Sequence, residues 1–318
     1  MLYDLPVTVP FRIVFFGTPE FAVPSLQTLL DGPDPVVGVV CQPDRPAGRG
    51  RHLTVPPVKQ LALQAGVPVV QPEKLRTPEF AERLRAWSPE LIVVAAYGRI
   101  LPKTILALPS RGCINVHASL LPKYRGAAPI QWAILNGEER TGVTIMQMNE
   151  RMDAGDILLQ RDTAIGADES YGTLQDRLAE LGTAALREAI AQLHSKTLTR
   201  QPQRDSDATP APMINKRDGR IDWTRPAVAI ARMVRAFNPW PSAFTAISGK
   251  LLKIHRAHVL PVTTTAAAGT VTAIDDGIAV ATGDGTLALD ELQVEGRKRL
   301  EAAEFARGGI LAPGTVLG

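Results

Sequence analysis

Residues 91–96 read LIVVAA, an apolar run with β-branched side chains at its centre. The run is too short to cross a membrane, which takes ~18 to 20 residues, and its composition favours a buried strand. Further short apolar runs lie on either side of it, with helical patterns between most of them: IVFF at 13–16, VVGVV at 36–40, INVH at 114–117 and VTIM at 143–146. Continuous apolar strands that alternate with helices predict an α/β fold with a mostly parallel sheet covered on both faces.

Helical periodicity is clearest between residues 171 and 194, where apolar side chains return at spacings of three to five. We expect this helix to close a first domain, residues 11–194. Periodicity is lost over residues 195–212, where Pro, Thr, Arg, Gln, Asp and Ser predict a linker. Residues 213–318 contain a short helical pattern, at 226–236, and then strand-like alternation at 243–247 and 251–257. They predict a smaller C-terminal β-barrel domain.

The composition of the whole chain is that of an ordinary globular protein. Of its 318 residues, 45% are hydrophobic and 21% are charged, which excludes a disordered or collagen-like chain. The net charge is only +3, so any attraction to an anionic partner has to be local. Cys41 and Cys113 lie in apolar runs and favour a reducing compartment, by default the cytoplasm. We expect neither a membrane span nor a targeting segment.

Polar side chains appear where the strand around residues 113–117 ends. Strand alternation places Asn115 and His117 on the same face. Ligands bind at the carboxyl ends of strands in open parallel sheets, so this position suits a functional site. The next strand leads into an acidic loop at 149–156, which we expect at the same edge of the sheet. One of its carboxylates could then reach His117.

An amide, an imidazole and a carboxylate without a serine or cysteine nucleophile suit a reaction between two substrates. The protein would supply an oxyanion donor, a proton relay and positioning. A histidine at a strand end is also a common structural group. This pattern alone therefore leaves the function open.

The residues that follow extend the pattern into a longer motif. Residues 115–129 read NVHASLLPKYRGAAP, and GVTI at 142–145 and DAGDI at 153–157 come after them. Together these motifs resemble the folate-dependent formyltransferase family, and most of all its members that act on methionyl-tRNA. The likeness covers most of the chain and returns in the second domain, for example in DGRIDW at 218–223.

The resemblance implies a Rossmann-like domain that binds 10-formyltetrahydrofolate, followed by an OB-like barrel. It implies transfer of the formyl group to the α-amine of methionyl-initiator tRNA, for translation initiation. By motif position, the catalytic residues of the family correspond to Asn115, His117 and Asp153, and its folate-holding stretch corresponds to Ser119, Leu120, Leu121 and Pro122. Many relatives have glycine directly after the histidine, whereas this chain has Ala118. That methyl group could narrow the approach to the folate.

A cationic loop follows the second strand, where residues 42–53 read QPDRPAGRGRHL. Its composition also fits a plain solvated loop. In the tRNA-acting relatives a basic loop at this place enters the acceptor end of the initiator tRNA, so the resemblance implies that Arg45, Arg49 and Arg51 bind tRNA. Residues 212–260 carry nine Lys and Arg against two Asp. This density predicts contacts with the tRNA backbone that weaken with salt.

Three alternatives remain open. A formyltransferase acting on a small amine, such as a nucleotide sugar or glycinamide ribotide, would share Asn115, His117 and Asp153. A non-catalytic RNA-binding protein on the same fold would not turn over folate. A nicotinamide oxidoreductase would need a Gly-x-Gly-x-x-Gly fingerprint, and GTPE stands in its place at 17–20. We predict no metal and expect a monomer.

Overall fold

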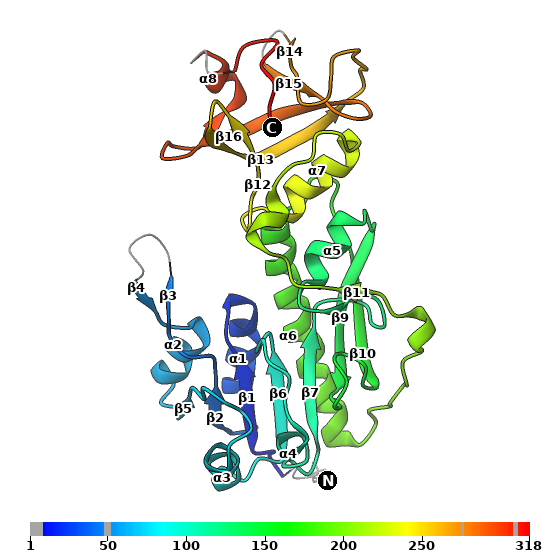
Figure 1. Ribbon diagram of the computed structural model, residues 1–318. Coiled ribbons are helices and arrows are strands. Elements are labelled where there is room, and N and C mark those ends of the chain that lie inside the picture. Colours follow the sequence, from blue (N-terminus) through cyan, green and yellow to red (C-terminus); the bar gives the residue numbers. More distant parts are fainter. Residues whose placement is uncertain (1–8, 48–51, 275–276, 308–310) are drawn as a thin grey trace, which may run out of the picture. The chain divides into compact units, whose positions relative to one another are not determined.

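The computed structural model describes residues 9–47, 52–274, 277–307 and 311–318. Its contacts divide the chain into two units. The first unit comprises the chain up to residue 129 with residues 140–163 and 175–211, and the second comprises residues 130–139, 164–174 and 212–318. Figure 1 labels elements of both units wherever there is room for a label.

The first unit is built on a sheet that has seven strands among the described residues, in the order β10-β9-β7-β6-β1-β2-β5. The strands are β1 (Ile13–Gly17), β2 (Val36–Val40), β5 (Val69–Val70), β6 (Leu91–Ala95), β7 (Cys113–His117), β9 (Arg140–Gln147) and β10 (Ile157–Ala164). From β5 to β7 all neighbours run parallel, whereas β9 pairs antiparallel with β7. The prediction of a mostly parallel sheet is confirmed.

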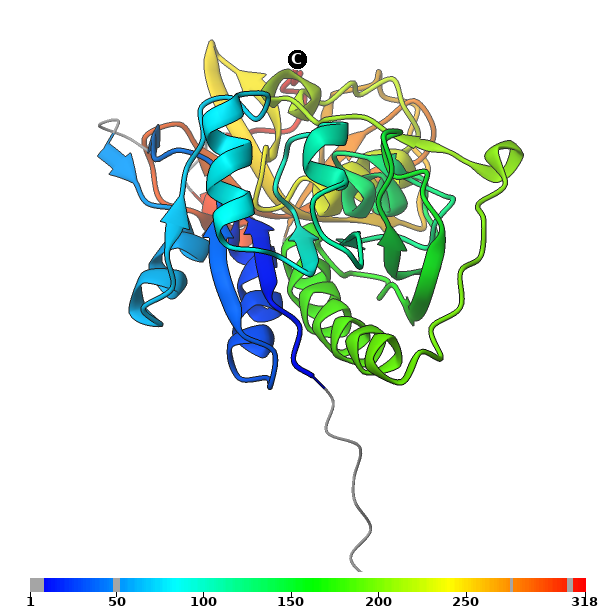
Figure 2. The ribbon, with the colours of Figure 1, turned by 90° about the horizontal axis from the view of Figure 1, so that it is seen from below.

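Helices cover both faces of this sheet. Figure 2 shows α3 (Pro78–Ala86) on one side and α1 (Val23–Leu30) and α6 (Tyr171–Ser195) on the other. Val14, Phe16 and Ile92 form a buried cluster with residues of α3 and α4 (Lys103–Leu106). On the opposite face a Cβ at Gly182 of α6 would lie 2.8 Å from Cγ1 of Val116, so glycine is required there. The helix predicted at residues 171–194 is confirmed. The first unit also contains η1 (Glu20–Ala22), α2 (Pro57–Gln64) and η2 (Asp205–Asp207).

Two short strand pairs complete the first unit. β3 (Arg45–Ala47) and β4 (His52–Thr54) form an antiparallel hairpin, and β8 (Arg125–Gly126) pairs in parallel with β11 (Pro210–Ala211).

The predicted linker at 195–212 thus lies on the first unit for most of its length. Besides β11, Gln201 exchanges two main-chain hydrogen bonds with Ile157, of 2.8 and 2.9 Å. The segment has little apolar character, so its attachment depends on hydrogen bonds that no periodic pattern reveals.

The second unit contains an antiparallel sheet in the order β12-β13-β16-β15-β14, with β17 paired to β16. Its elements are α5 (Pro129–Leu135), η3 (Lys216–Gly219), α7 (Ala227–Ala236), β12 (Ala243–Ile247), β13 (Lys250–Leu260), β14 (Val271–Ile274), β15 (Gly277–Ala281), β16 (Thr286–Val294), β17 (Leu300–Glu301) and α8 (Ala302–Arg307). This sheet confirms the predicted C-terminal β domain. We keep residues 11–194 and 213–318 as the proposed catalytic and tRNA-binding domains. Among the described residues no helix combines the length and the apolar character that crossing a membrane takes.

Candidate active site

Strand β7 positions two of the residues singled out by sequence. It lies between β6 and β9, so its main chain is paired on both sides. Cys113 at its start belongs to the cluster beneath α3 and α4, and strand alternation puts Asn115 and His117 on that same side, further along the strand. Asn115 is half-buried, and only 6% of His117 is exposed. Both side chains therefore lie on the side of the sheet that α3 and α4 cover, toward the carboxyl end of β7.

His117 is held between a main-chain carbonyl and a carboxylate. Its Nε2 lies 3.0 Å from the carbonyl oxygen of Tyr124, and its Nδ1 lies 3.8 Å from Oδ2 of Asp153. A carbonyl oxygen can only accept, so in the neutral ring Nε2 carries the hydrogen and Nδ1 carries the lone pair. Nδ1 is thus the atom that can take up a proton, and the carboxylate opposite it would stabilise the resulting positive charge.

Asp153 is fixed by the backbone around it. Its Oδ2 accepts a hydrogen bond of 2.9 Å from the backbone N–H of Gly126. Its φ of 48° lies in the left-handed region, which aspartate adopts more readily than most residues. The side chains of His117 and Asp153 are 6% and 17% exposed. The pair is therefore largely shielded from water.

The route by which Asp153 reaches His117 differs from our prediction. We expected the acidic loop at 149–156 to leave its strand at the edge where His117 lies. Because β9 is antiparallel to β7, Gln147 at its end pairs with Ile114 near the start of β7. The strand ends at the opposite edge, so that part of the prediction was wrong. The loop nevertheless returns far enough to bring the carboxylate to the imidazole.

The stretch from Ser119 to Pro122 forms a turn that an internal hydrogen bond stabilises. The hydroxyl of Ser119 is fully buried and donates to the carbonyl of Lys123 at 2.6 Å. Leu121 is also buried, whereas Leu120 and Pro122 are half-buried. The serine therefore builds the turn, and Leu120 and Pro122 offer its accessible apolar surface.

Two polar side chains that the sequence reasoning missed support this turn. Thr144 Oγ1 donates to the carbonyl of Ser119 at 2.7 Å and accepts from the backbone N–H of Leu121 at 3.1 Å. Gln160 Nε2 donates to Thr144 Oγ1 and to the carbonyl of Leu121, both at 2.9 Å. Thr144 is fully buried in an otherwise apolar stretch of β9. The hydroxyl of Thr144 within this apolar run was the signal that could have identified it, because buried hydroxyls need hydrogen-bond partners.

The basic loop predicted at residues 42–53 is in part a hairpin. Arg45 pairs with Thr54 across β3 and β4, and its side chain is exposed. Arg49 and Arg51 lie outside the residues that the structure describes. The hairpin therefore carries at least one of the three predicted tRNA contacts on an accessible strand.

An ion pair fixes the base of this hairpin. Lys59 Nζ lies 2.7 Å from Oδ2 of Asp44, and Gln71 donates to Oδ1 of the same carboxylate at 2.7 Å. The hydrogen bond from Lys59, together with that from Gln71, holds the pKa of Asp44 below its usual value.

A pocket of about 460 Å³ opens beside Arg45, where β1, β2 and β6 end. Its lining includes Thr18, Gln42 and Arg99. Gln42 Nε2 donates to the carbonyl of Tyr97 at 3.0 Å, but its buried Oε1 has no partner among the described residues. A buried acceptor without a donor costs free energy of folding.

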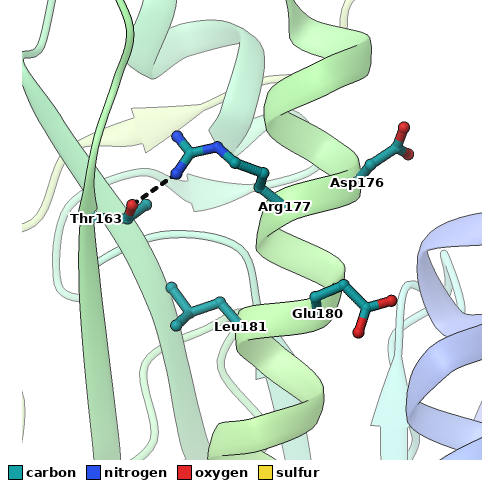
Figure 3. A pocket seen from close by; sticks show the side chains of 5 residues that line it. All are labelled: Thr163, Asp176, Arg177, Glu180 and Leu181. Atoms are coloured by element: carbon teal, nitrogen blue, oxygen red, sulfur yellow. Dashed lines mark hydrogen bonds between the residues drawn. The ribbon is translucent and has the colours of Figure 1, made fainter.

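A second pocket, of about 450 Å³, lies between β10 and α6 and is shown in Figure 3. In Figure 3, Arg177 and Leu181 point toward the strand, with Arg177 donating to Thr163 Oγ1 at 2.8 Å, and Asp176 and Glu180 lie on the far side of the helix. Helix α6 covers the face of the sheet opposite to His117. This groove therefore does not belong to the candidate active site.

Neither cysteine is a candidate nucleophile. Burial raises the pKa of Cys41 to about 11 and that of Cys113 to about 12. Both are therefore thiols near neutral pH. Within the described ranges no group of three or more His, Cys, Asp or Glu side chains gathers as metal ligands would.

Many of the Lys and Arg side chains of the second unit are exposed. Of the nine between residues 212 and 260, those with exposed side chains are Lys216, Arg217, Arg220, Arg225, Lys250 and Arg256. Of the aromatic residues nearby, Trp223 is buried and donates from Nε1 to Thr245 Oγ1 at 3.1 Å, whereas Trp240 is 52% exposed. Trp223 is therefore a core residue, and Trp240 is available to a ligand.

Comparisons with known proteins match both units. A family profile described as "Formyl transferase" matches residues 11–190, and one described as "Formyl transferase, C-terminal domain" matches residues 213–309. The proteins named "Methionyl-tRNA formyltransferase" from Desulfotalea psychrophila and Myxococcus xanthus are each 53% identical to this chain, over 307 and 305 residues. These alignments cover 96% of this chain and 95% and 97% of the two relatives.

A solved structure supports the fold. The N-formyltransferase from Helicobacter canadensis, in complex with folinic acid and dTDP-3-aminofucose, superposes with a TM-score of 0.65. It is 18% identical, and the match covers 88% of this chain and 98% of that one. At this identity the likeness concerns the fold alone.

Proposed function

Because the chain belongs to the methionyl-tRNA formyltransferases of the formyl transferase family, we propose that Asn115, His117 and Asp153 perform its reaction. The formyl group of 10-formyltetrahydrofolate passes to the α-amino group of methionyl-initiator tRNA. The observation that carries this function is the 53% identity to the Desulfotalea psychrophila relative, which extends over both units. We propose that the reaction takes place in the cytoplasm, where translation is initiated.

The attacking group is the α-amine of the methionyl ester. Its reference pKa of ~7.7 to 8.0 leaves an appreciable neutral fraction at physiological pH, so it needs little activation. Attack on the formyl carbon forms the new C–N bond and places a negative charge on the formyl oxygen. The Asn115 amide donates to this oxyanion, an interaction of a kind that stabilises the transition state by ~3 to 4 kcal/mol.

The geometry of His117 suits it to accept the proton that the attacking nitrogen must lose. Its Nε2 hydrogen is committed to the carbonyl of Tyr124, and its Nδ1 faces Asp153. We propose that Nδ1 accepts the ammonium proton and later delivers it to the departing folate nitrogen, as the bond between that nitrogen and the formyl carbon breaks. His117 can donate to the oxyanion only while Nδ1 carries this proton. Asp153 then stabilises the imidazolium and keeps the ring oriented.

We propose that the folate lies against the turn from Ser119 to Pro122. Leu120 and Pro122 would contact it through apolar surface, and Ser119 and Leu121 would maintain the shape of the turn. The support for this assignment is the turn's position, since it directly follows His117 in the chain. Ala118 is 7% exposed, so its methyl group lies in the packed interior.

We propose that the tRNA is bound by the basic hairpin, through Arg45, Arg49 and Arg51, and by the cations of the second unit. Arg45 lines the same pocket as Gln42, whose buried Oε1 has no partner among the described residues. Guanidinium groups bind phosphate with paired hydrogen bonds, and such contacts position a nucleic acid without reading its sequence.

The second candidate is formyl transfer to a small amine, which the same three residues could perform. The basic hairpin favours the tRNA substrate, because a small amine offers no row of phosphates. The test is a comparison of acceptors with 10-formyltetrahydrofolate: charged initiator tRNA, uncharged tRNA, free methionine and an amino sugar nucleotide. We expect formylmethionine only from the charged tRNA. Faster transfer to the sugar nucleotide would overturn the proposal in favour of the second candidate.

A further inference from the structure

The segment that follows α6 contacts both neighbours of the imidazole of His117. Thr209 accepts from the backbone N–H of Arg125 through its carbonyl and from that of Tyr124 through Oγ1, both at 2.9 Å. Tyr124 is the residue whose carbonyl faces His117. A stretch of chain with the composition of a linker therefore fixes the main chain on which the imidazole rests.

Gln203 lies at the centre of this contact and uses its whole amide. Its Nε2 donates to the carbonyl of Asp153 at 2.9 Å and to that of Gly155 at 2.7 Å. Its Oε1 accepts from Nε and Nη2 of Arg125, at 3.0 and 2.8 Å. Two donors and two acceptor sites are all that a glutamine side chain has. No smaller or singly functional side chain could make the same four bonds.

Asp205 reinforces the same arrangement. It forms ion pairs with Arg125 at 2.9 Å and with Arg151 at 2.6 Å. Arg151 belongs to the loop that carries Asp153. The two arginines thus link the β8 segment and the acidic loop a second time, through the carboxylate of Asp205, whose side chain is 57% exposed.

Gln203 therefore joins the two segments that face His117. One of them contains Tyr124 and Gly126, which bind His117 Nε2 and Asp153 Oδ2 respectively. The other contains Asp153 itself, whose left-handed φ of 48° needs support from its surroundings. The 3.8 Å between Nδ1 and the carboxylate depends on how these segments are held together.

We propose that Gln203 is a positioning residue for the pair of His117 and Asp153, and that the chain after α6 serves as a clamp on the active site. This inference rests on the proposed function, since it assigns Gln203 an effect on the transfer step. Gln203 touches neither reacting group. Its influence passes through the main-chain carbonyls of Asp153 and Gly155 and through the side chain of Arg125 in β8.

The test is the substitution Gln203→Glu, which keeps the size of the side chain and the pairing with Arg125. The carboxylate has no hydrogens for the carbonyls of Asp153 and Gly155, so it should push the acidic loop away. We expect kcat for formyl transfer to fall by about tenfold to a hundredfold, because a small misplacement of reacting groups has an effect of this size. The KM values for folate and for methionyl-tRNA should stay within about twofold of the wild-type values, because the substitution leaves the contacts that bind both substrates in the ground state unchanged.

The matched control is Gln201→Glu, the same change two positions earlier in the same segment. The side chain of Gln201 is exposed, and its attachment to Ile157 uses only main-chain atoms. It should leave kcat, KM and the thermal midpoint unchanged. Equal losses in both variants would overturn the proposal, because they would reflect added charge on the segment alone.

A double-mutant cycle separates positioning from general stability. If Gln203 acts through Asp153, then Gln203→Glu should cost little more once Asp153→Asn is present. Multiplicative losses in kcat would overturn the proposal. If Gln203→Glu does not fold, Arg125→Lys replaces it in the cycle, because it removes the paired contacts with Oε1. Wild-type enzyme without formyl transfer would instead contradict the proposed function.

Discussion

His117 and Arg45 belong to the same unit, but their surroundings are opposite. His117 is 6% exposed, and each ring nitrogen faces a partner on a different segment of chain. Arg45 stands exposed on a two-stranded hairpin, which is fixed at its base by Asp44 and Lys59. A group that transfers a proton needs a fixed geometry, whereas a group that attracts phosphate needs access. Chemistry and tRNA capture should therefore separate under mutation.

The sharpest test of this separation is Asn115→Ala. Loss of the amide that we propose as the oxyanion donor should lower turnover by about 100-fold or more. Both KM values should change little, because the interaction forms only in the transition state. Single-turnover formyl transfer measures the effect. A decrease below threefold would remove Asn115 from the oxyanion role.

The next effect is expected from Asp153→Asn, which keeps the shape of the side chain and removes its charge. Without the carboxylate, a proton on His117 Nδ1 loses its stabilising partner, so kcat should fall by about tenfold to a hundredfold. Asp156→Asn provides a control in the same loop. Similar losses in the two variants would show that the loop tolerates neither change and that Asp153 has no special part.

On the capture side, Arg45→Ala and Arg49→Ala should each raise the KM for methionyl-tRNA, by about tenfold. The slope of log kcat/KM against log salt concentration should become shallower by about one per residue removed. The KM for folate should not change. Unaltered kinetics with tRNA at both positions would break the comparison, since the hairpin would then have no part in capture.

A smaller effect is expected for Thr144→Val, within the turn that follows His117. The change leaves the carbonyl of Ser119 and the N–H of Leu121 without their partner, which should cost about 1 to 3 kcal/mol of stability. We expect the KM for folate to rise severalfold and the KM for tRNA to stay constant. Thermal unfolding and initial rates measure the two parts. An unchanged folate KM would separate this turn from the folate site.

The smallest effect is expected at the base of the hairpin, for Asp44→Asn. The pKa of Asp44 is lowered by its bond to Lys59, so its contribution to stability is present above the usual aspartate pKa of ~3.9. That contribution is lost as pH falls through the lowered pKa. Urea unfolding should show that the variant has a slightly lower free energy of unfolding than the wild type at pH 6. This difference should shrink toward pH 3. A difference independent of pH would exclude the ion pair as its source.

The predicted and the unpredicted contacts of the candidate active site differ in the sequence separation of the residues that they join. Alternation within one strand placed Asn115 and His117 together, and motif resemblance added Asp153. The contact of His117 with Tyr124 spans seven positions, and that of Gln203 with Asp153 spans fifty. Only the folded chain shows which carbonyl lies opposite which donor.

The direction of β9 shows the same limit within the sheet. The pattern of an apolar strand does not indicate its direction in the sheet, because side-chain alternation is the same in both directions. Whether β9 runs parallel or antiparallel to β7 depends on the path of the connection between them. The sequence therefore predicted the strand, and only the fold revealed that the acidic loop must return to reach His117.

By itself, the sequence determined the layered α/β domain, the second β domain, the family and the three polar residues of the candidate site. These depend on local periodicity and on motifs, both of which are written in neighbouring positions. The tertiary structure alone decided that Thr144 and Gln160 support the turn at Ser119, and that Gln203 clamps the loop of Asp153. Hydrogen bonds between distant segments depend on where the main chain passes, and main-chain carbonyls and N–H groups are the same in nearly every residue type.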